Sequence, residues 1–285
     1  MIKLNNEVLE INKFPDGTPL IKVDGKYSRL REATITWHYE SNEEMSFLMF
    51  LTRHLQNNGV SSVHLVMPYI PNARQDRVKN VEDVFTLKYF AEFINSLHFN
   101  TVTVLDPHSS VSEALIDNII IESPEKYIDK VFSELCKLPE NSGSNSLMVF
   151  YPDEGAMKRY SGLVSMPHHA FGIKRRDWST GKIEGLDVAG ETNLVAERNI
   201  LIIDDISSRG GTFYHSAKKL KELGAKHIYL YITHCERTIF EGEIFKSGLI
   251  DKVFTTNSIF GEKEKEYANT IGVADKMEVF EYEKD

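Results

Sequence analysis

The 285-residue chain has only two cysteines, Cys136 and Cys235, which lie far apart and form no CxxC pair. This spacing matches neither a disulfide framework nor a metal-binding cluster, so we interpret both as packing residues in a reducing compartment, the cytoplasm. No apolar run approaches the length that crosses a bilayer, and the first residues lack a signal-peptide pattern. The sequence therefore indicates neither membrane insertion nor secretion.

An excess of positive charge is also missing, because the formal net charge is −9. Such a molecule repels polyanions, which argues against extended nucleic-acid binding. One local basic cluster, Lys174-Arg175-Arg176, can still bind a small phosphorylated ligand. The hydrophobic fraction of 41% and charged fraction of 26% are ordinary for a globular protein.

Short apolar runs alternate with segments of helical periodicity, as is typical of βαβ units and parallel sheets. The predicted strands are 63–67, 102–105, 147–151, 200–203 and 228–232, and the predicted helices are 43–58, 84–97 and 213–223. The polar stretch 139–145 (PENSGSN) is the best candidate for a linker. We therefore predict two α/β domains, residues 1–145 and 146–285.

Four polar clusters follow predicted strands: residues 68–77, 106–108, 153–154 and 204–212. Ligands of open parallel sheets bind outside the carboxyl ends of the strands. This common placement predicts that the clusters take part in one site.

The most informative segment is the loop LIIDDISSRGGTF, residues 201–213. An apolar strand leads to Asp204-Asp205, and Gly210-Gly211 then opens a helix at Thr212. Glycines let the backbone approach an anion, the helix N-terminus adds partial positive charge, and carboxylates accept hydrogen bonds from ribose hydroxyls. An ordinary βα turn is the alternative, but the combination favours phosphoribosyl binding.

This loop resembles the one with which type I phosphoribosyltransferases bind phosphoribosyl diphosphate (PRPP). The segment MPYIPNARQDR (67–77) resembles that of the ribose-phosphate pyrophosphokinases, the PRPP synthetases. Further motifs match that family in the same order: FPDG (14–17), LDPH (105–108), PDEG (152–155), KRR (174–176), Thr233-His234 and TNSI (256–259). The resemblance implies two phosphoribosyltransferase-like domains, each a mostly parallel sheet flanked by helices, in a homo-oligomer, either a dimer or a hexamer.

The resemblance also implies an ATP site. The residues that match the family's ATP-binding segment are Arg74, Gln75, Asp76 and Arg77. The planar guanidinium of arginine suits phosphate oxygens. Phe14 and Asp16 match a loop that, in the family, reaches the nucleotide site of a neighbouring subunit, with the ring stacked on adenine. The family's glutamate in this loop is replaced by Thr18.

Two residues, His108 and Asp153, match the metal ligands of the family. His108 also matches a residue of the family's ATP site. Because Mg²⁺ prefers oxygen and keeps several waters, such a site needs substrate phosphates to complete it. Lys174 and Arg176 match catalytic residues of a mobile loop, and they would stabilise charge on the transferred phosphoryl group. The glycine-containing segment 177–190 is a candidate lid.

The implied reaction is Mg²⁺-dependent transfer of a diphosphoryl group from ATP to the anomeric hydroxyl of a ribose 5-phosphate-type sugar, with release of AMP. The sugar-phosphate site would consist of Asp204, Asp205, Ser208, Arg209, Gly210, Gly211 and Thr212. The family's loop usually reads D-T-x-G-T, whereas here an acid and a threonine are replaced by Ser208 and Arg209. The more positive pocket fits either ribose 5-phosphate or ADP-ribose.

Two other function classes share parts of this pattern. A phosphoribosyltransferase would use the same loop but would need neither the ARQDR segment nor His108 nor the Lys174 and Arg176 pair. A non-catalytic PRPP synthetase-associated subunit would be expected to have lost metal or catalytic positions, which are retained here. The sequence therefore favours the enzyme.

Overall fold

The structure is a computed structural model that describes residues 1–141, 147–176 and 183–284, without the side chains of 28, 29, 174–176 and 183–185. The chain forms two compact units, Met1–Ser123 together with the C-terminal end, and Pro124–Tyr282. The predicted boundary at residue 145 falls among residues 142–146, outside the described residues, and stays a prediction. No helix in the described part is long and apolar enough to cross a membrane.

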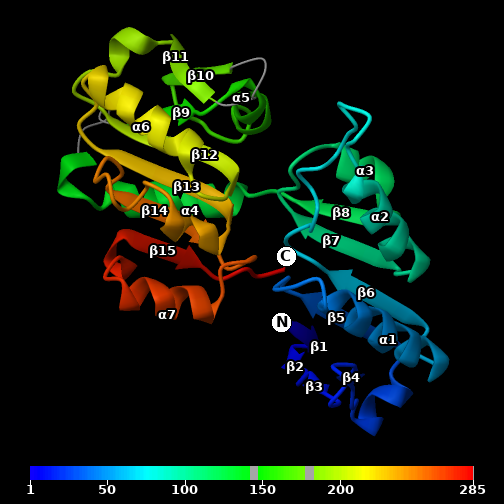
Figure 1. Cartoon of the computed structure of the whole chain (residues 1–285). Coiled ribbons are helices and arrows are strands. Elements are labelled where there is room, and N and C mark those ends of the chain that lie inside the picture. Colours follow the sequence, from blue (N-terminus) through cyan, green and yellow to red (C-terminus); the bar gives the residue numbers. More distant parts are fainter. Residues whose placement is uncertain (142–146, 177–182, 285) are drawn as a thin grey trace. The chain divides into compact units, whose positions relative to one another are not determined.

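The first unit contains a six-stranded sheet in the order β2-β1-β5-β6-β7-β8 (Figure 1). Its strands are β1 (Ile2–Leu4), β2 (Glu7–Val8), β5 (Glu32–Trp37), β6 (Ser62–Val66), β7 (Thr101–Leu105) and β8 (Ile119–Glu122). The strands from β5 to β8 are parallel, and β1 and β2 are antiparallel additions at one edge. A separate hairpin pairs β3 (Asn12–Lys13) with β4 (Pro19–Leu20).

The helices of this unit are α1 (Glu44–Asn57), α2 (Thr86–Ser96) and α3 (Val111–Leu115). Helix α1 buries Phe47, Leu48 and Leu51, which recur at helical spacing, in one core with the sheet residues Ile35 and Leu65. The predicted helix 43–58 is confirmed, and Gly59, with a φ of 86°, follows its end. The predicted strands 63–67 and 102–105 correspond to β6 and β7.

The second unit contains a seven-stranded sheet in the order β11-β10-β9-β12-β13-β14-β15. Its strands are β9 (Leu147–Tyr151), β10 (His169–Arg176), β11 (Ile183–Gly190), β12 (Asn199–Ser207), β13 (Ile228–Cys235), β14 (Lys252–Thr256) and β15 (Met277–Phe280). Neighbouring strands are parallel except for the β10–β11 pair. Every residue of β13 is buried, as expected of a central parallel strand that is covered on both faces.

Four α-helices are described in this unit: α4 (Glu125–Cys136), α5 (Glu154–Tyr160), α6 (Gly211–Glu222) and α7 (Glu262–Thr270). Figure 1 shows α6 running beside the strands of the sheet. Phe213, Ala217 and Leu220 of α6 enter a core with Ile202 and Leu230 of the central strands. Both sheets are thus mostly parallel and flanked by helices, and this confirms the predicted fold class.

Two expectations need correction. The predicted strand 200–203 continues to Ser207, because its parallel ladder with β13 extends to the pair Ser207 and Cys235. Asp204-Asp205 therefore lies within the strand and not in the loop after it. In the candidate lid, residues 183–190 form β11, which is paired antiparallel with β10; residues 177–182 lie outside the described residues.

Candidate active site

In each unit, predicted site residues follow neighbouring parallel strands. In the first unit, β6 and β7 pair directly and lead into residues 68–77 and 106–108. In the second unit, β9 and β12 pair directly; Asp153 follows β9, and the loop 208–210 follows β12. Because the carboxyl ends of parallel strands lie at one edge of a sheet, each unit gathers its own group of polar side chains.

The group in the first unit is built around Asp76, whose side chain is 4% exposed. Arg77 donates from Nε to Oδ1 at 2.7 Å and from Nη2 to Oδ2 at 3.0 Å. These hydrogen bonds, with smaller contributions from the Ser109 hydroxyl and from His108, hold the pKa of Asp76 below its usual value. The structure therefore brings together Asp76, Arg77 and His108, which the sequence assigned to nucleotide binding.

Arg74 and Gln75 are exposed beside this group. The Gln75 carbonyl accepts the Leu87 N–H at 3.3 Å, and its side-chain oxygen accepts the Thr86 hydroxyl at 3.0 Å. These bonds tie the segment to the first turn of α2. Arg77 keeps 63% of its side chain exposed, so its remaining N–H donors can face a phosphorylated ligand.

Phe14 and Asp16 lie in the turn between β3 and β4. Oδ1 of Asp16 accepts both the Thr18 N–H at 3.0 Å and the Thr18 hydroxyl at 2.7 Å, which lowers the pKa of Asp16. The residue that replaces the family's glutamate therefore shapes the turn. The Phe14 ring is 49% exposed, and a ring at the tip of a hairpin can stack on a flat partner.

The second unit gathers three carboxylates. Asp153 caps the N-terminus of α5 and accepts the Ala156 N–H at 3.0 Å. Oδ1 of Asp204 accepts the Asp205 N–H at 3.0 Å. Burial, together with the neighbouring charges of Asp205 and Asp153, raises the pKa of Asp204 well above its usual value.

A cluster of carboxylates suits a hard divalent cation, since Mg²⁺ takes carboxylate oxygens. In the described residues, no group of three or more His, Cys, Asp or Glu side chains is arranged to hold a metal. A Mg²⁺ ion bound at Asp153 would therefore need further oxygen ligands from substrate phosphates and water.

The loop that opens α6 is packed tightly. Gly210 has a φ of 72°, which favours glycine, and a Cβ at this position would lie 2.5 Å from Ile244. The first helical bond of α6 is donated by Tyr214 to the Gly210 carbonyl at 2.9 Å. The N–H groups of Gly211 and Thr212 precede it at the helix N-terminus, where an anion binds well.

Two side chains of this loop contact the segment that follows β13. The Ser208 hydroxyl lies 3.1 Å from the Thr238 hydroxyl, which donates to Glu236 at 3.2 Å. Arg209 donates from Nε and Nη2 to one oxygen of Glu241, at 3.1 and 3.0 Å. Sequence reasoning missed Thr238 and Glu241, since their positions beyond the Thr233-His234 motif carry no phosphate-binding pattern.

Lys174 and Arg176 lie in β10, where Lys174 pairs with Leu186 across the ladder and the register shifts between Arg175 and Arg176. Their side chains lie outside the described part of the structure. Their catalytic assignment therefore stays a prediction.

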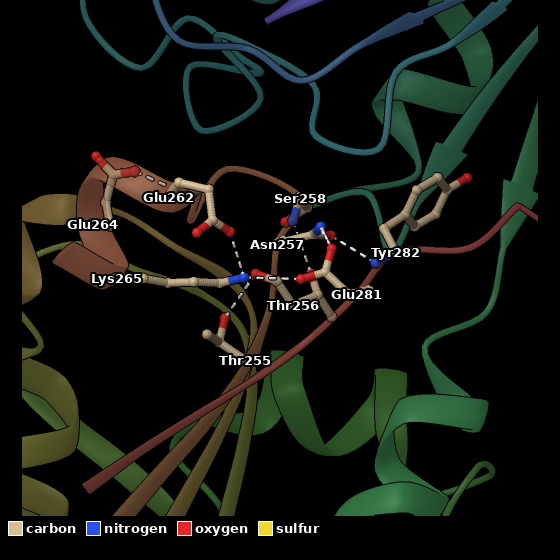
Figure 2. A network of polar contacts seen from close by, with 10 residues as sticks. Thr255, Thr256, Asn257, Ser258, Glu262, Glu264, Lys265, Glu281 and Tyr282 are labelled. Carbon is tan, nitrogen blue, oxygen red and sulfur yellow. Dashed lines mark hydrogen bonds and ion pairs between the residues drawn. The ribbon is translucent and has the colours of Figure 1, made fainter. Parts of the chain in front are cut away.

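The motifs Thr233-His234 and TNSI (256–259) meet at the ends of β13 and β14. His234, which is 3% exposed, is hydrogen-bonded through Nδ1 to the Ser258 hydroxyl at 2.7 Å, and the Thr256 hydroxyl donates to the Thr233 carbonyl at 2.7 Å. Figure 2 shows the adjoining network, in which Lys265 bridges Glu262 and Glu281, each at 2.8 Å. These contacts fix the strand ends on which the loops of the second unit stand.

The chain is similar to several ribose-phosphate pyrophosphokinases. It is 28% identical over 256 residues to that of Thermococcus kodakarensis, with 88% of this chain and 85% of the relative covered. It is 29% identical over 272 residues to that of Mycoplasma pneumoniae, with 90% and 78% covered. No family model matches the sequence.

The fold is similar to that of a phosphoribosylpyrophosphate synthetase from Mycobacterium smegmatis. The TM-score is 0.76 at 17% identity, with 96% of this chain and 86% of that chain covered. The likeness in fold and the sequence matches extend over most of the length of both proteins. These findings confirm the resemblance to the ribose-phosphate pyrophosphokinases that the sequence motifs indicate.

Proposed function

We propose that this protein transfers the β,γ-diphosphoryl group of ATP to the anomeric hydroxyl of ribose 5-phosphate and releases AMP, with Mg²⁺ bound. One observation carries most of the weight: Asp204-Asp205 lies in the last part of β12, and the loop that follows this strand opens α6. Acceptors for sugar hydroxyls and donors for a phosphate are thus separated by one short turn. Similarity to ribose-phosphate pyrophosphokinases over most of the chain supports this assignment.

In this proposal the acids accept hydrogen bonds from the ribose hydroxyls, while the N–H groups of Gly211 and Thr212 hold the 5-phosphate. The anomeric oxygen attacks the β-phosphorus in line, a C1–O–P link forms, and the bond from the β-phosphorus to the α,β-bridging oxygen breaks. AMP leaves with that oxygen, and the hydroxyl proton passes to water. Positioning and charge stabilisation supply most of the rate.

We assign the remaining residues as follows. Arg74, Gln75, Asp76, Arg77 and His108 bind ATP, together with Phe14 and Asp16 supplied by a neighbouring subunit of a homo-oligomer. His108 and Asp153 are the side chains that hold Mg²⁺, which neutralises triphosphate charge when bound. Lys174 and Arg176 stabilise the transferred group.

The test is to separate nucleotide products by chromatography after incubation with ATP, Mg²⁺ and ribose 5-phosphate. AMP should accumulate, a chelator should abolish it, and Asp205→Asn should reduce it, because the variant loses an ionised acceptor for the sugar. Accumulation of ADP instead would contradict the proposed site of attack.

A second substrate, ADP-ribose, is favoured by Arg209. The loop carries this guanidinium where the family usually has threonine, and its side chain is 72% exposed, with Glu241 as a surface partner. An exposed ion pair is worth about 0–1 kcal/mol, so a diphosphate can compete for Arg209. The same chemistry would then give ADP-ribose 1-diphosphate, a precursor from which NAD could be rebuilt.

The Arg209→Thr variant tests this second substrate. We expect its kcat/KM for ADP-ribose to fall about tenfold or more, since a charge-assisted hydrogen bond contributes about 1.5–3 kcal/mol. Its kcat/KM for ribose 5-phosphate should change less. An unchanged preference between the two sugars would show that Arg209 does not select the substrate.

A further inference from the structure

Arg159 links the two acidic motifs of the second unit. It lies in α5, the helix that Asp153 caps, and its Nη1 is 3.0 Å from Oδ2 of Asp205 in β12. The Asp205 side chain is 5% exposed and that of Arg159 is 27% exposed, so the pair is largely removed from water. One short helix therefore places a carboxylate and a guanidinium beside the Asp204-Asp205 pair.

The neighbouring cation of the same helix behaves differently. Lys158 pairs with Glu154 at 2.7 Å, and both side chains are about two-thirds exposed or more. Successive residues of a helix point about 100° apart, so Arg159 faces the acids while Lys158 faces solvent. Arg159 is also anchored by its sequence neighbour Tyr160, which is fully buried, with 5.7 Å between the guanidinium carbon and the ring centroid.

The ion pair makes the two adjacent acids unequal. Asp205 has a guanidinium beside it, whereas Asp204 accepts the Asp205 N–H and faces the charges of Asp205 and Asp153. A buried carboxylate that loses its partner tends to take up a proton or to turn toward water. Either change would spoil Asp205 as a fixed acceptor for a sugar hydroxyl.

We propose that Arg159 is a positioning residue for the sugar, which keeps the Asp205 carboxylate ionised and in one orientation. This inference rests on the proposed function, because it takes Asp205 to be a sugar ligand. Arg159 acts through Asp205 and needs no contact with the substrate. The step that it serves is binding of the ribose diol, not the transfer of the diphosphoryl group.

The experiment compares Arg159→Met with Lys158→Met, which removes a cation from the adjacent position of the same helix. We expect Arg159→Met to raise the KM for ribose 5-phosphate roughly tenfold or more, with the KM for ATP within about twofold of the parent. Lys158→Met should leave both values near the parent. Arg159→Lys should restore part of the sugar affinity, since it keeps the charge without the planar fork.

A double-substitution cycle separates positioning from a general effect on folding. If Arg159 acts through Asp205, Arg159→Met combined with Asp205→Asn should bind the sugar about as well as Asp205→Asn alone. An equal loss in both backgrounds, or an unchanged sugar KM in Arg159→Met, would overturn the inference. Thermal melts identify any variant that fails to fold, and Arg159→Lys then replaces it in the cycle.

Failure of the proposed function would be seen separately. If the parent protein releases no AMP, the same variants are compared by calorimetric titration with ribose 5-phosphate, which needs no turnover. Weaker binding by Arg159→Met alone would support the positioning role without the reaction. Equal binding by the parent and Arg159→Met, or binding by neither, would overturn it.

Discussion

Gly242 offers a sharp test of what holds the loop 208–210, to which we assign the sugar phosphate. It follows the short helix Arg237–Glu241 with a φ of −85°, a backbone conformation that alanine also adopts. A Cβ at this position would lie 1.8 Å from the Arg209 carbonyl oxygen and 2.9 Å from its carbonyl carbon. The methyl group of Gly242→Ala therefore collides with the backbone of the loop 208–210 and not with a flexible side chain.

The size of the effect follows from that distance. Real contacts of this kind are essentially never closer than 3.0 Å, so the loop and residue 242 must separate. A shift of roughly 1 Å in a site can cost about a hundredfold in rate. Overpacking itself costs about 1–3 kcal/mol of stability, and each kcal/mol lowers the melting temperature of a chain of this size by about 2–4 °C.

We therefore expect Gly242→Ala to lower kcat/KM for the sugar about a hundredfold while the protein stays folded at 25 °C. The assay is AMP release at varied sugar concentration, with thermal melts in parallel. Gly162→Ala is the matched control, because a Cβ there has no heavy atom within 4 Å and the backbone is not left-handed. Parent-like kinetics in Gly242→Ala would refute the view that the contact between Gly242 and Arg209 determines the position of the loop.

Two further predictions concern charge and exposure. Burial and the neighbouring acids raise the pKa of Asp204. The folded chain therefore binds a proton at Asp204 more tightly than the unfolded chain does. As a result, the free energy of unfolding falls as the pH rises above about 4. Thermal melts should show Asp204→Asn more stable than the parent at neutral pH and no longer so below about pH 4; equal curves at neutral pH would refute the raised pKa. Because the Phe14 ring is 49% exposed, Phe14→Ala should leave the melting temperature nearly unchanged. Its KM for ATP should rise about fivefold or more, since stacking on a base contributes about 1–3 kcal/mol, and an unchanged KM would remove Phe14 from the nucleotide site.

Much of the fold could be predicted because strand and helix periods are local properties. The strand 147–151 is confirmed residue for residue, and the predicted helix that ends at Gly224 corresponds to α6, after which Gly224 has a φ of 91°. The predicted end of β12 was wrong because Asp204 and Asp205 have low strand propensity. Pairing with β13 outweighs that propensity, and no local pattern reveals it.

The groups of site residues were predictable as far as they lie at the ends of parallel strands. Asp153 and Asp204 meet for this reason, and so do Asp76 and His108. Contacts that depend on how a helix is rotated or where a loop folds back were not predictable. The ion pair of Arg159 with Asp205 and the contact of Gly242 with Arg209 both join residues more than thirty positions apart.

The most direct test of the central claim is ³¹P NMR of the purified protein with ATP and Mg²⁺, run separately with ribose 5-phosphate and with ADP-ribose. We predict that, with at least one sugar, ATP signals are replaced by equal amounts of AMP and a new diphosphate attached to C1. Conversion of ATP to ADP, or no consumption of ATP with either sugar, would contradict the account.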